Sequence, residues 1–374
     1  MNHIAIASVN KDQYSETFIH DQVKNLPAEV TVLHGGYLPN LADGKLIAGY
    51  DSDKGLVRQK MGAVLNQATK VKIRKGLVDY LRSNKIELVI AHYGPCGVEM
   101  VEVCEAAGIP LFVYFHGYDV YRKEELKRFG PEYKKVFEKA ANIFSVSSDM
   151  TARLCDLGCP VEKITYNPCG VNTENFVPPL VNSGSNQFAA VGRLVEKKGF
   201  SVLLQAFAAV VDQIPDAHLK IAGDGPLQKS LIKLTRKLGL GEKVEFVGRL
   251  SREDILLLLQ NSFAFVQPSV VAHDGDCDGT PVTLLEAGSC GLPLIGSDIA
   301  GISDVIDSGS NGFLVDPGNA EELAASMIYM LKKRTLAKKM GGQARSTIVQ
   351  SFNLEDSLEK LWQCCKEQLT SPAS

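Results

Sequence analysis

Short runs of aliphatic and aromatic residues recur along the chain, separated by amphipathic patterns of helical period. Runs that are apolar at every position, without alternation, are typical of strands covered on both faces, as in parallel sheets. In the first half we predict strands at Ile4–Val9, Val30–His34, Leu88–His92, Leu111–Phe115 and Ile143–Val146. Helical patterns between them include Val101–Ala107 and Glu132–Ala140. This alternation predicts a doubly wound α/β domain.

The alternation is interrupted at Phe176–Asn186, a segment rich in Pro, Ser, Gly and Asn, as interdomain linkers are. It then restarts, with strands predicted at Phe188–Gly192, Leu219–Ala222, Val244–Val247, Ala264–Gln267 and Leu292–Gly296. Helices are predicted at Gly199–Gln213, Leu227–Leu238, Ser251–Gln260 and Val282–Gly288. The second half therefore has the same expected architecture as the first.

The chain ends with three amphipathic helical patterns, Ala320–Lys333, Leu336–Val349 and Leu354–Leu369. A length of 374 residues also favours two domains. We predict an N-terminal domain over residues 1–175, a linker over 176–186, a second domain over 187–353 and a final helix over 354–374.

Charge adds one feature to this picture. The formal net charge of −3 is too small to indicate a nucleic-acid-binding protein. Lys and Arg nevertheless outnumber Asp and Glu between Lys54 and Lys139, notably in Lys70–Lys75 and Arg122–Lys139. Such residues can be ordinary solvated helix faces, or they can attract an anionic membrane or acceptor.

The nine cysteines are odd in number and include no Cys-x-x-Cys pair, so neither a zinc nor a disulfide framework is expected. The first ten residues read as a short buried strand and not as a signal peptide, and no stretch of about 18 apolar residues indicates a membrane span. These observations predict a cytoplasmic protein.

The first motif that carries chemistry is Gly192-Arg193-Leu194 followed by Lys197-Lys198-Gly199, between a predicted strand and a helix. Cationic side chains and a helix N-terminus converge there, as a diphosphate site requires. An exposed basic loop is the alternative. A second loop in the same position of its βα unit, Gly223-Asp224-Gly225-Pro226, can be a structural turn or part of the same site.

The third motif runs from Asp274 through Asp276 and Asp278 into a helix that carries Glu286. A calcium loop is disfavoured because Leu285 occupies the twelfth position, where such a loop needs Glu. An Asp-x-Asp metal clamp, as in some sugar transferases, is an alternative, but any acidic loop matches so short a pattern. We favour a nucleotide-sugar site, in which one carboxylate reaches the sugar and the other binds the ribose hydroxyls. The first-turn N–H groups of Val282 and Thr283 can then face a phosphate.

Two further motifs follow predicted strands in the first half. His116, in Phe115-His116-Gly117-Tyr118-Asp119, stands at the carboxyl end of a strand, where ligands bind in open α/β sheets. Ser15, Glu16 and Thr17 follow the first strand and either contact an acceptor or cap a helix.

Taken together, the motifs resemble the retaining glycosyltransferases of family 4, which have the GT-B fold. They appear in the family's order: SETFI at 15–19, FHGYD at 115–119, GVN at 170–172, GRLVEKKG at 192–199, AGDGP at 222–226, FVGRL at 246–250, DGTPVTLLEA at 278–287 and GLP at 291–293. The resemblance covers nearly the whole chain. The first two motifs resemble those of bacterial transferases of exopolysaccharide or lipid-linked glycan assembly.

The resemblance implies two Rossmann-like domains facing a central cleft, with the final helix crossing back to the first domain. It places Arg193 and Lys198 on the donor diphosphate, Glu286 on the ribose, the loop at Gly248 near the base, and His116 at the reaction centre. The expected catalytic residues are His116, Asp278, Arg193 and Lys198. The expected donor site comprises Arg193, Lys198, Gly223, Gly225, Gly248, Asp278, Gly279, Thr280, Pro281, Val282, Thr283 and Glu286. The expected acceptor site comprises Ser15, Glu16, Thr17, His116 and Asp119.

The implied reaction moves a sugar from a UDP- or GDP-sugar to a glycan or lipid-linked acceptor with retention. Arg193, Lys198 and a helix dipole can stabilise the leaving diphosphate without a metal, so no metal or other cofactor is expected. Asp278 stands where the family usually has Glu, which opens the donor sugar to question. The alternatives are an inactive nucleotide-sugar-binding paralogue and a sugar-nucleotide epimerase of related fold. A dinucleotide-dependent dehydrogenase is disfavoured by the lack of a G-x-G-x-x-G motif after the first strand.

Overall fold

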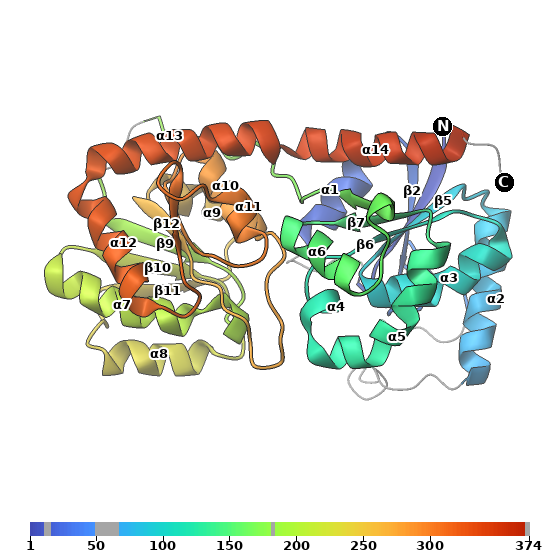
Figure 1. Ribbon diagram of the computed structural model, residues 1–374, viewed down its shortest axis with the longest axis horizontal. Coiled ribbons are helices and arrows are strands. Elements are labelled where there is room, and N and C mark those ends of the chain that lie inside the picture. Colours follow the sequence, from blue (N-terminus) through green and yellow to red (C-terminus); the bar gives the residue numbers. More distant parts are fainter. Residues whose placement is uncertain (11–15, 49–66, 181–183, 371–374) are drawn as a thin grey trace. The chain divides into compact units, whose positions relative to one another are not determined.

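The computed structural model describes residues 1–10, 16–48, 67–180 and 184–370. The chain forms two compact units (Figure 1). Unit 1 contains residues 1–167 and 358–374, and unit 2 contains residues 168–357. The division at residue 167 precedes the predicted boundary at residue 175.

The segment predicted as a linker, 176–186, begins inside unit 2. The ring of Phe176 is only 2% exposed and belongs to the hydrophobic core of that unit. Its carbonyl oxygen accepts hydrogen bonds from Ser289 Oγ at 2.6 Å and Arg345 Nη1 at 2.8 Å. The prediction of a linker starting at residue 176 is therefore wrong, because composition does not reveal that this aromatic side chain is anchored.

Unit 1 is built on a sheet with the strand order β4-β3-β2-β1-β5-β6-β7-β8. Its strands are β1 (His3–Ala7), β2 (Glu29–His34), β3 (Leu41–Ala42), β4 (Lys45–Leu46), β5 (Leu88–His92), β6 (Leu111–Tyr114), β7 (Asn142–Ser145) and β8 (Ile164–Tyr166). Its helices are α1 (Thr17–Asn25), α2 (Gln67–Ser83), α3 (Gly94–Ala107), α4 (Tyr118–Tyr121), α5 (Lys123–Lys139) and α6 (Ser148–Asp156), with the 3-10 turn η2 (Val161–Lys163). Among the strand pairs that the structure describes in unit 1, only the short pairs β2–β3 and β3–β4 are antiparallel.

Unit 2 has an all-parallel sheet with the order β11-β10-β9-β12-β13-β14. Its strands are β9 (Gln187–Val191), β10 (His218–Ala222), β11 (Val244–Gly248), β12 (Ala264–Gln267), β13 (Leu294–Ser297) and β14 (Gly312–Val315). Its helical elements are η3 (Glu196–Lys198), α7 (Phe200–Gln213), α8 (Gln228–Lys237), α9 (Arg252–Gln260), α10 (Val282–Ser289), α11 (Ile302–Val305), α12 (Ala320–Lys332) and α13 (Arg334–Ser351). Numbered along the chain from one to six, its strands have the order 3-2-1-4-5-6, that of a Rossmann fold.

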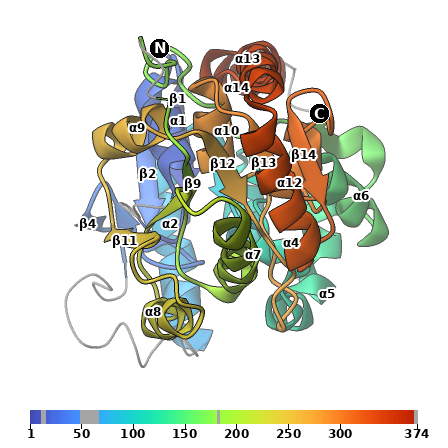
Figure 2. The same cartoon turned by 90° about the vertical axis from the view of Figure 1, so that its left-hand side faces the viewer.

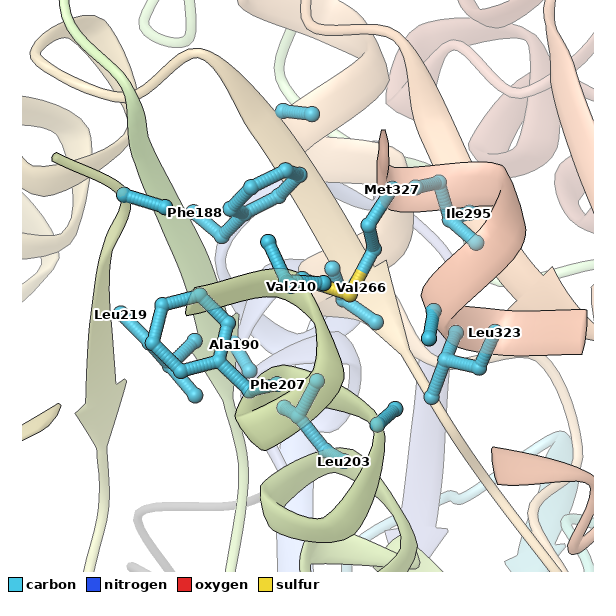
Figure 3. Close-up of a cluster of buried hydrophobic side chains, with 14 of the residues drawn as sticks. Phe188, Ala190, Leu203, Phe207, Val210, Leu219, Val266, Ile295, Leu323 and Met327 are labelled. Atoms are coloured by element: carbon cyan, nitrogen blue, oxygen red, sulfur yellow. The ribbon is translucent and has the colours of Figure 1, made fainter. Parts of the chain in front are cut away.

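Two hydrophobic clusters cover the two faces of the unit 2 sheet. Phe188 and Val266 of the sheet pack against Phe207 of α7 and Met327 of α12 on one face (Figure 3). Helices α7 and α12 are neighbours there, as Figure 2 also shows. Residues of α9, α10 and α13 pack on the other face. Strands buried on both faces explain the continuous apolar runs in the sequence.

The last helix, α14 (Leu354–Thr370), begins in unit 2, and its residues from Leu358 onward belong to unit 1. Within unit 1, Leu361 and Cys365 are fully buried, and Lys360 Nζ donates to Tyr166 O at 2.8 Å.

Four cations of helices α2 and α5 in the basic first half pair with glutamates of α3. The pairs are Lys70–Glu99, Arg74–Glu99, Arg74–Glu102, Lys135–Glu102 and Lys139–Glu105. These side chains are therefore engaged within unit 1, which favours the interpretation of this region as solvated helix faces. No helix in the described ranges is long and apolar enough to cross a membrane.

Candidate functional site

The carboxyl ends of β9 and β12 mark the centre of the candidate site in unit 2. These strands are neighbours, and the strand order reverses between them. In open α/β sheets, ligands bind beyond the carboxyl ends of the strands at this switch point. The loop after β9 carries Arg193, Lys197 and Lys198, and the loop after β12 carries Ser269 and Asp278. The fold thus brings together two motifs that are far apart in the sequence.

The lysines of the first loop pair with the aspartates of the second. Lys198 Nζ lies 2.8 Å from Asp278 Oδ2, and both side chains are largely buried, at 13% and 7% exposure. Lys197 Nζ lies 3.0 Å from Asp276 Oδ1 and 3.7 Å from Asp278 Oδ1. Arg193 is exposed on the same loop, and its charge adds a small effect to that of burial in lowering the pKa of Lys198.

The Asp278 carboxylate is held by neutral side chains as well. Ser269 Oγ donates to Asp278 Oδ2 at 2.7 Å, and Gln267 Nε2 donates to Ser269 Oγ at 2.8 Å. Because the single Ser269 proton goes to Asp278, Gln267 must present its amino group to Ser269. Gln267 Oε1 is then left buried and without a partner within the described residues.

Opposing effects act on the ionisation of the Lys198–Asp278 pair. Burial alone would raise the pKa of Asp278, but the charges of Lys198 and Lys197 outweigh it and hold the pKa below its ordinary value. Burial lowers the pKa of Lys198, although the Asp278 charge opposes this shift. The lowered pKa of Asp278 keeps its carboxylate ionised at neutral pH, as a partner for the ammonium group.

Gly199 and the Gly223–Gly225 loop fix the backbone around these lysines. Gly199 has φ +63°, and a Cβ atom there would lie 1.7 Å from Pro268 O. A Cβ on Gly223, at φ +130°, would lie 1.9 Å from Gly192 O. Leu194 N donates to Asp224 O at 2.7 Å. Gly223 and Gly225 thus lock the loop that carries Arg193, and a direct donor contact by either glycine stays a prediction.

Helix α10 provides the remaining predicted donor residues. Glu286 is buried, at 4% exposure, while Val282 and Thr283 are half-buried in the first turn, where α-helices leave N–H groups without intrahelical acceptors. The preceding turn is fixed because Gly301 N donates to Gly279 O at 3.1 Å, and a Cβ on Gly301 would lie 2.3 Å from Thr280 Oγ1. Gly279, Thr280 and Pro281 therefore present the helix N-terminus in a defined position.

Two other predicted residues of unit 2 lie near these loops. Gly248 ends β11 with φ +72°, its carbonyl accepts from Gly223 N at 2.7 Å, and the space beside its Cα is open. Asp274 Oδ1 accepts from Asp276 N at 3.0 Å and so shapes its own loop. No group of three or more His, Cys, Asp or Glu side chains within the described ranges is arranged to hold a metal.

In unit 1 the equivalent switch point lies between β1 and β5, and His116 follows the next strand, β6. His116 is half-buried among rings, with centroids 4.4 Å from Phe18, 4.9 Å from Tyr93 and 5.1 Å from Tyr114. Its Nε2 lies 2.8 Å from His92 Nδ1. Burial, together with His92, lowers the pKa of His116 well below its ordinary value.

Asp119 positions this loop and does not face a ligand. The side chain is 0% exposed, and its carboxylate accepts hydrogen bonds from Gly94 N at 3.0 Å, Gly117 N at 2.8 Å and His116 N at 3.2 Å. Burial raises its pKa to about 6, against the lowering effect of these backbone donors. The expectation that Asp119 contacts an acceptor directly is therefore wrong for this geometry, because its oxygens are enclosed by their own loop.

Of the predicted acceptor residues after β1, Ser15 lies outside the described residues. Glu16 and Thr17 are half-buried at the start of α1, and Glu16 Oε1 accepts from Tyr93 OH at 3.0 Å. This bond ties the loop after β1 to the loop after β5, next to His116.

Sequence reasoning missed four polar residues of these two clusters: His92, Gln22, Gln267 and Ser269. His92 and Gln267 each end an apolar strand, β5 and β12. A polar residue that closes an otherwise apolar run, at the carboxyl end of a parallel strand, is the signal that could have found them.

Comparison with known proteins gives the family. Residues 15–175 match the model of Glycosyltransferase Family 4, and residues 171–347 match that of Glycosyl transferases group 1. The chain is 32% identical to the colanic acid biosynthesis glycosyltransferase WcaL of Escherichia coli K12, over 64% of this chain and 60% of that protein, less than two thirds of its length. It is 27% identical to an E. coli UDP-Gal:alpha-D-GlcNAc-diphosphoundecaprenol alpha-1,3-galactosyltransferase, over 76% of each chain.

The fold has counterparts among solved structures. HepE of Anabaena, crystallised with UDP, aligns with a TM-score of 0.78 at 17% identity, covering 98% of this chain and 100% of that one. Sucrose-phosphate synthase of Thermosynechococcus elongatus aligns with a TM-score of 0.76 at 19% identity, covering 98% and 99%. The two successive family matches, in the order that the motifs predict, confirm the resemblance. The chain belongs to the family 4 glycosyltransferases and has the GT-B fold.

Proposed function

We propose that this enzyme transfers a sugar, with retention of anomeric configuration, from a UDP- or GDP-sugar to a glycan or lipid-linked acceptor of polysaccharide assembly. The observation that carries the proposal is the cluster of Lys197, Lys198 and Arg193 beside the first turn of α10 at the switch point of unit 2. Cations and helix N–H groups are the donors that a diphosphate requires.

The same residues supply the chemistry. Negative charge develops on the diphosphate as the glycosidic bond breaks, and Lys198 and Arg193 stabilise it electrostatically. This stabilisation needs no metal, so we propose a metal-independent reaction. The acceptor hydroxyl loses its proton to the departing phosphate on the same face of the sugar, which accounts for retention without a separate general base.

In this proposal, Asp278 and Glu286 contact different parts of the donor. Glu286, buried on α10, binds the ribose hydroxyls, and Asp278 is directed to the sugar. We propose that acceptor contacts come from unit 1, through Ser15, Glu16, Thr17 and His116. The relatives named for colanic acid synthesis and for a lipid-linked galactosyl transfer support this acceptor class. A cytoplasmic location with peripheral contact to an anionic membrane is part of the proposal, and exposed cations of α2 and α5, such as Lys72 and Lys134, would make that contact.

A nucleotide-sugar panel tests the proposal. The melting temperature is measured with UDP-, GDP-, ADP- and dTDP-sugars, each with and without EDTA. A ligand that binds only the folded state stabilises it by about 2.7 kcal/mol at 100 times its Kd. We expect one nucleotide family to raise the melting temperature, and EDTA to leave that rise unchanged.

Two variants localise the effect. Glu286→Gln should lose the shift because the amide cannot accept two ribose hydrogen bonds as the carboxylate does. Glu253→Gln, an exposed carboxylate on α9 of the same unit, should keep it. No shift with any nucleotide sugar would contradict donor binding, and a shift abolished by EDTA would contradict the metal-independent reaction.

A further inference from the structure

A line of three side chains runs from the core of unit 1 to the half-buried ring of His116. His92 Nδ1 lies 2.8 Å from His116 Nε2, and His92 Nε2 lies 2.9 Å from Gln22 Oε1. His92 ends β5 and is 0% exposed, and Gln22 is a buried residue of α1. The line thus joins three different elements of the unit.

Proton counting along this line fixes the tautomer of each ring. Gln22 Oε1 can only accept, so His92 Nε2 carries the proton. Burial lowers the pKa of His92 to about 3, so the ring is neutral at pH 7 and its Nδ1 is a lone-pair acceptor. The contact at 2.8 Å then requires His116 to donate from Nε2. A neutral His116 ring keeps its lone pair on Nδ1.

The surroundings of His116 leave Nδ1 as its functional atom. Near-parallel packing against Tyr114 and tilted ring contacts with Phe18 and Tyr93 restrict the ring orientation. Within the described part of the chain Nδ1 has no hydrogen-bond partner, and the half-buried position of His116 leaves this nitrogen to a ligand. The titratable side chains that face the ring are His92, Tyr93 and Tyr114.

We propose that Gln22 and His92 are positioning residues that hold His116 as the neutral, Nε2-protonated tautomer, so that its Nδ1 accepts a hydrogen bond from a sugar hydroxyl. The inference rests on the proposed function for its ligand class, a sugar substrate. It makes His116 a hydrogen-bond acceptor that selects for a hydroxyl, and not a cation that neutralises the diphosphate. The second ring nitrogen sets the role of the first, as in other paired imidazoles.

Nitrogen-15 NMR of the histidine-labelled full chain at pH 7 tests the tautomer without any ligand. The chain has seven histidines, and the His116 signals are identified by their loss in His116→Gln. We expect the shift of a protonated nitrogen for Nε2 and of an unprotonated one for Nδ1, in both His92 and His116. A proton on Nδ1 of His116, or a charged ring, overturns the proposal. Because no turnover is measured, this result is independent of whether the chain is a transferase.

Two matched pairs of variants separate positioning from packing. His92→Asn places an oxygen acceptor near the site of Nδ1, whereas His92→Phe keeps a ring and removes the acceptor. Gln22→Glu retains the acceptor, whereas Gln22→Met removes it. We expect His116 to keep its tautomer in His92→Asn and Gln22→Glu and to lose the single Nε2-protonated state in His92→Phe and Gln22→Met. The same tautomer in all four variants overturns the relay.

The consequence for turnover is measured with the donor that the nucleotide panel identifies. His92→Phe should lower kcat/KM by roughly tenfold relative to His92→Asn, the worth of one hydrogen bond. Melting curves of the two variants establish that both are folded, and unchanged binding of the nucleoside diphosphate shows that unit 2 is intact. Equal kcat/KM in the two variants, with the tautomer altered only in His92→Phe, overturns the link to the sugar hydroxyl.

Discussion

Replacing Asp278 by Asn tests whether the buried carboxylate is the counter-ion that Lys198 keeps until a diphosphate arrives. The substitution preserves shape and one oxygen acceptor for Ser269 but removes the charge. At an effective dielectric constant of 20, the attraction across 2.8 Å to Lys198 is about 6 kcal/mol, and across 3.7 Å to Lys197 about 4 kcal/mol. Desolvation offsets most of this attraction. Removing one partner of a buried pair costs about 3–5 kcal/mol, because the other charge stays buried.

We therefore expect Asp278→Asn to lower the free energy of unfolding of unit 2 by about 3 kcal/mol at pH 7. The lowered pKa of Asp278 sets the pH window. Its stabilisation is present above the unfolded-state pKa of about 3.9 and is lost as the pH falls through the lower folded-state pKa. Wild type and variant should thus converge in acid.

The nucleotide response is the more informative measurement. In the variant, Lys198 and Lys197 lack their shared counter-ion, so a diphosphate gains more by binding between them. UDP or GDP, whichever stabilises the wild type, should bind Asp278→Asn about tenfold more tightly, a difference of about 1.4 kcal/mol. Neither compound carries the sugar that Asp278 is expected to contact, so loss of that contact does not enter the result.

Asp276→Asn is the matched control. Asp276 pairs with Lys197 at 3.0 Å but is 20% exposed and has no ion pair with Lys198 in the described residues. A smaller loss of about 1 kcal/mol and little change in nucleotide affinity are expected.

Urea unfolding should be followed by circular dichroism and by tryptophan fluorescence in parallel. Trp362, the only tryptophan, lies in the part of α14 that belongs to unit 1 and so reports on that unit alone. Weaker or unchanged nucleotide binding by Asp278→Asn would refute the counter-ion argument.

Two further substitutions test the scaffolds of the two clusters. Gly223→Ala should destabilise unit 2 by more than about 3 kcal/mol, because the added Cβ would lie 1.9 Å from Gly192 O. The control Gly241→Ala, where no atom lies within 4 Å of the added Cβ, should be nearly neutral. Equal urea midpoints for the two variants would contradict the close contact between the loops at Gly192 and Gly223. Asp119 should stabilise unit 1 fully below pH 4 and lose this contribution as the pH rises through about 6, because its folded-state pKa is raised. The stability difference between wild type and Asp119→Asn, followed by Trp362 fluorescence, should then fall by about 2 kcal/mol between pH 4 and pH 7, and a pH-independent difference would show that the pKa of this carboxyl is not raised.

The central strands could be predicted from sequence because each is a continuous apolar run buried on both faces. All ten predicted strands form, within two residues at most ends. The two-residue strands β3 and β4 carry too little pattern to be found. Helix α3 begins at Gly94, seven residues before the predicted start at Val101, because Gly94-Pro95-Cys96-Gly97 has the composition of a loop. The glycines are needed there, since a Cβ on Gly94 would lie 2.4 Å from the ring of Phe115.

The predicted start of α5 is wrong because of a proline. The sequence predicts a helix that begins at Glu132, directly after Pro131, yet the helix starts at Lys123 and contains that proline. Packing of the apolar face, with Phe129, Tyr133 and Val136 buried, outweighs the local cost of the missing N–H group.

The sequence predicts the positions of single residues in the candidate site but not the contacts between them. The rule that ligand-binding residues follow the carboxyl ends of parallel strands depends only on topology. It therefore located Arg193, Lys198, Asp278 and His116 in the loops after the strands. The pairing of Lys198 with Asp278 depends on a contact between residues 80 positions apart, and the pairing of Lys197 with Asp276 spans 79 positions. No local pattern encodes such contacts.

The pairing also gives a physical reason for Asp at position 278, where the family resemblance leads one to expect Glu. Asp278 Oδ2 accepts from Lys198 at 2.8 Å and from Ser269 at 2.7 Å, and Ser269 is in turn held by Gln267. A side chain longer by one methylene would carry the carboxylate out of this fully bonded position, which is set by strand β12 and by the loop at Gly199. The shorter side chain therefore keeps the negative charge against Lys198, where it permits a cation to stay buried before any donor binds. The shorter side chain extends less far toward the donor sugar. We therefore expect the donor preference of this enzyme to depend on which group fills the space left by the missing methylene.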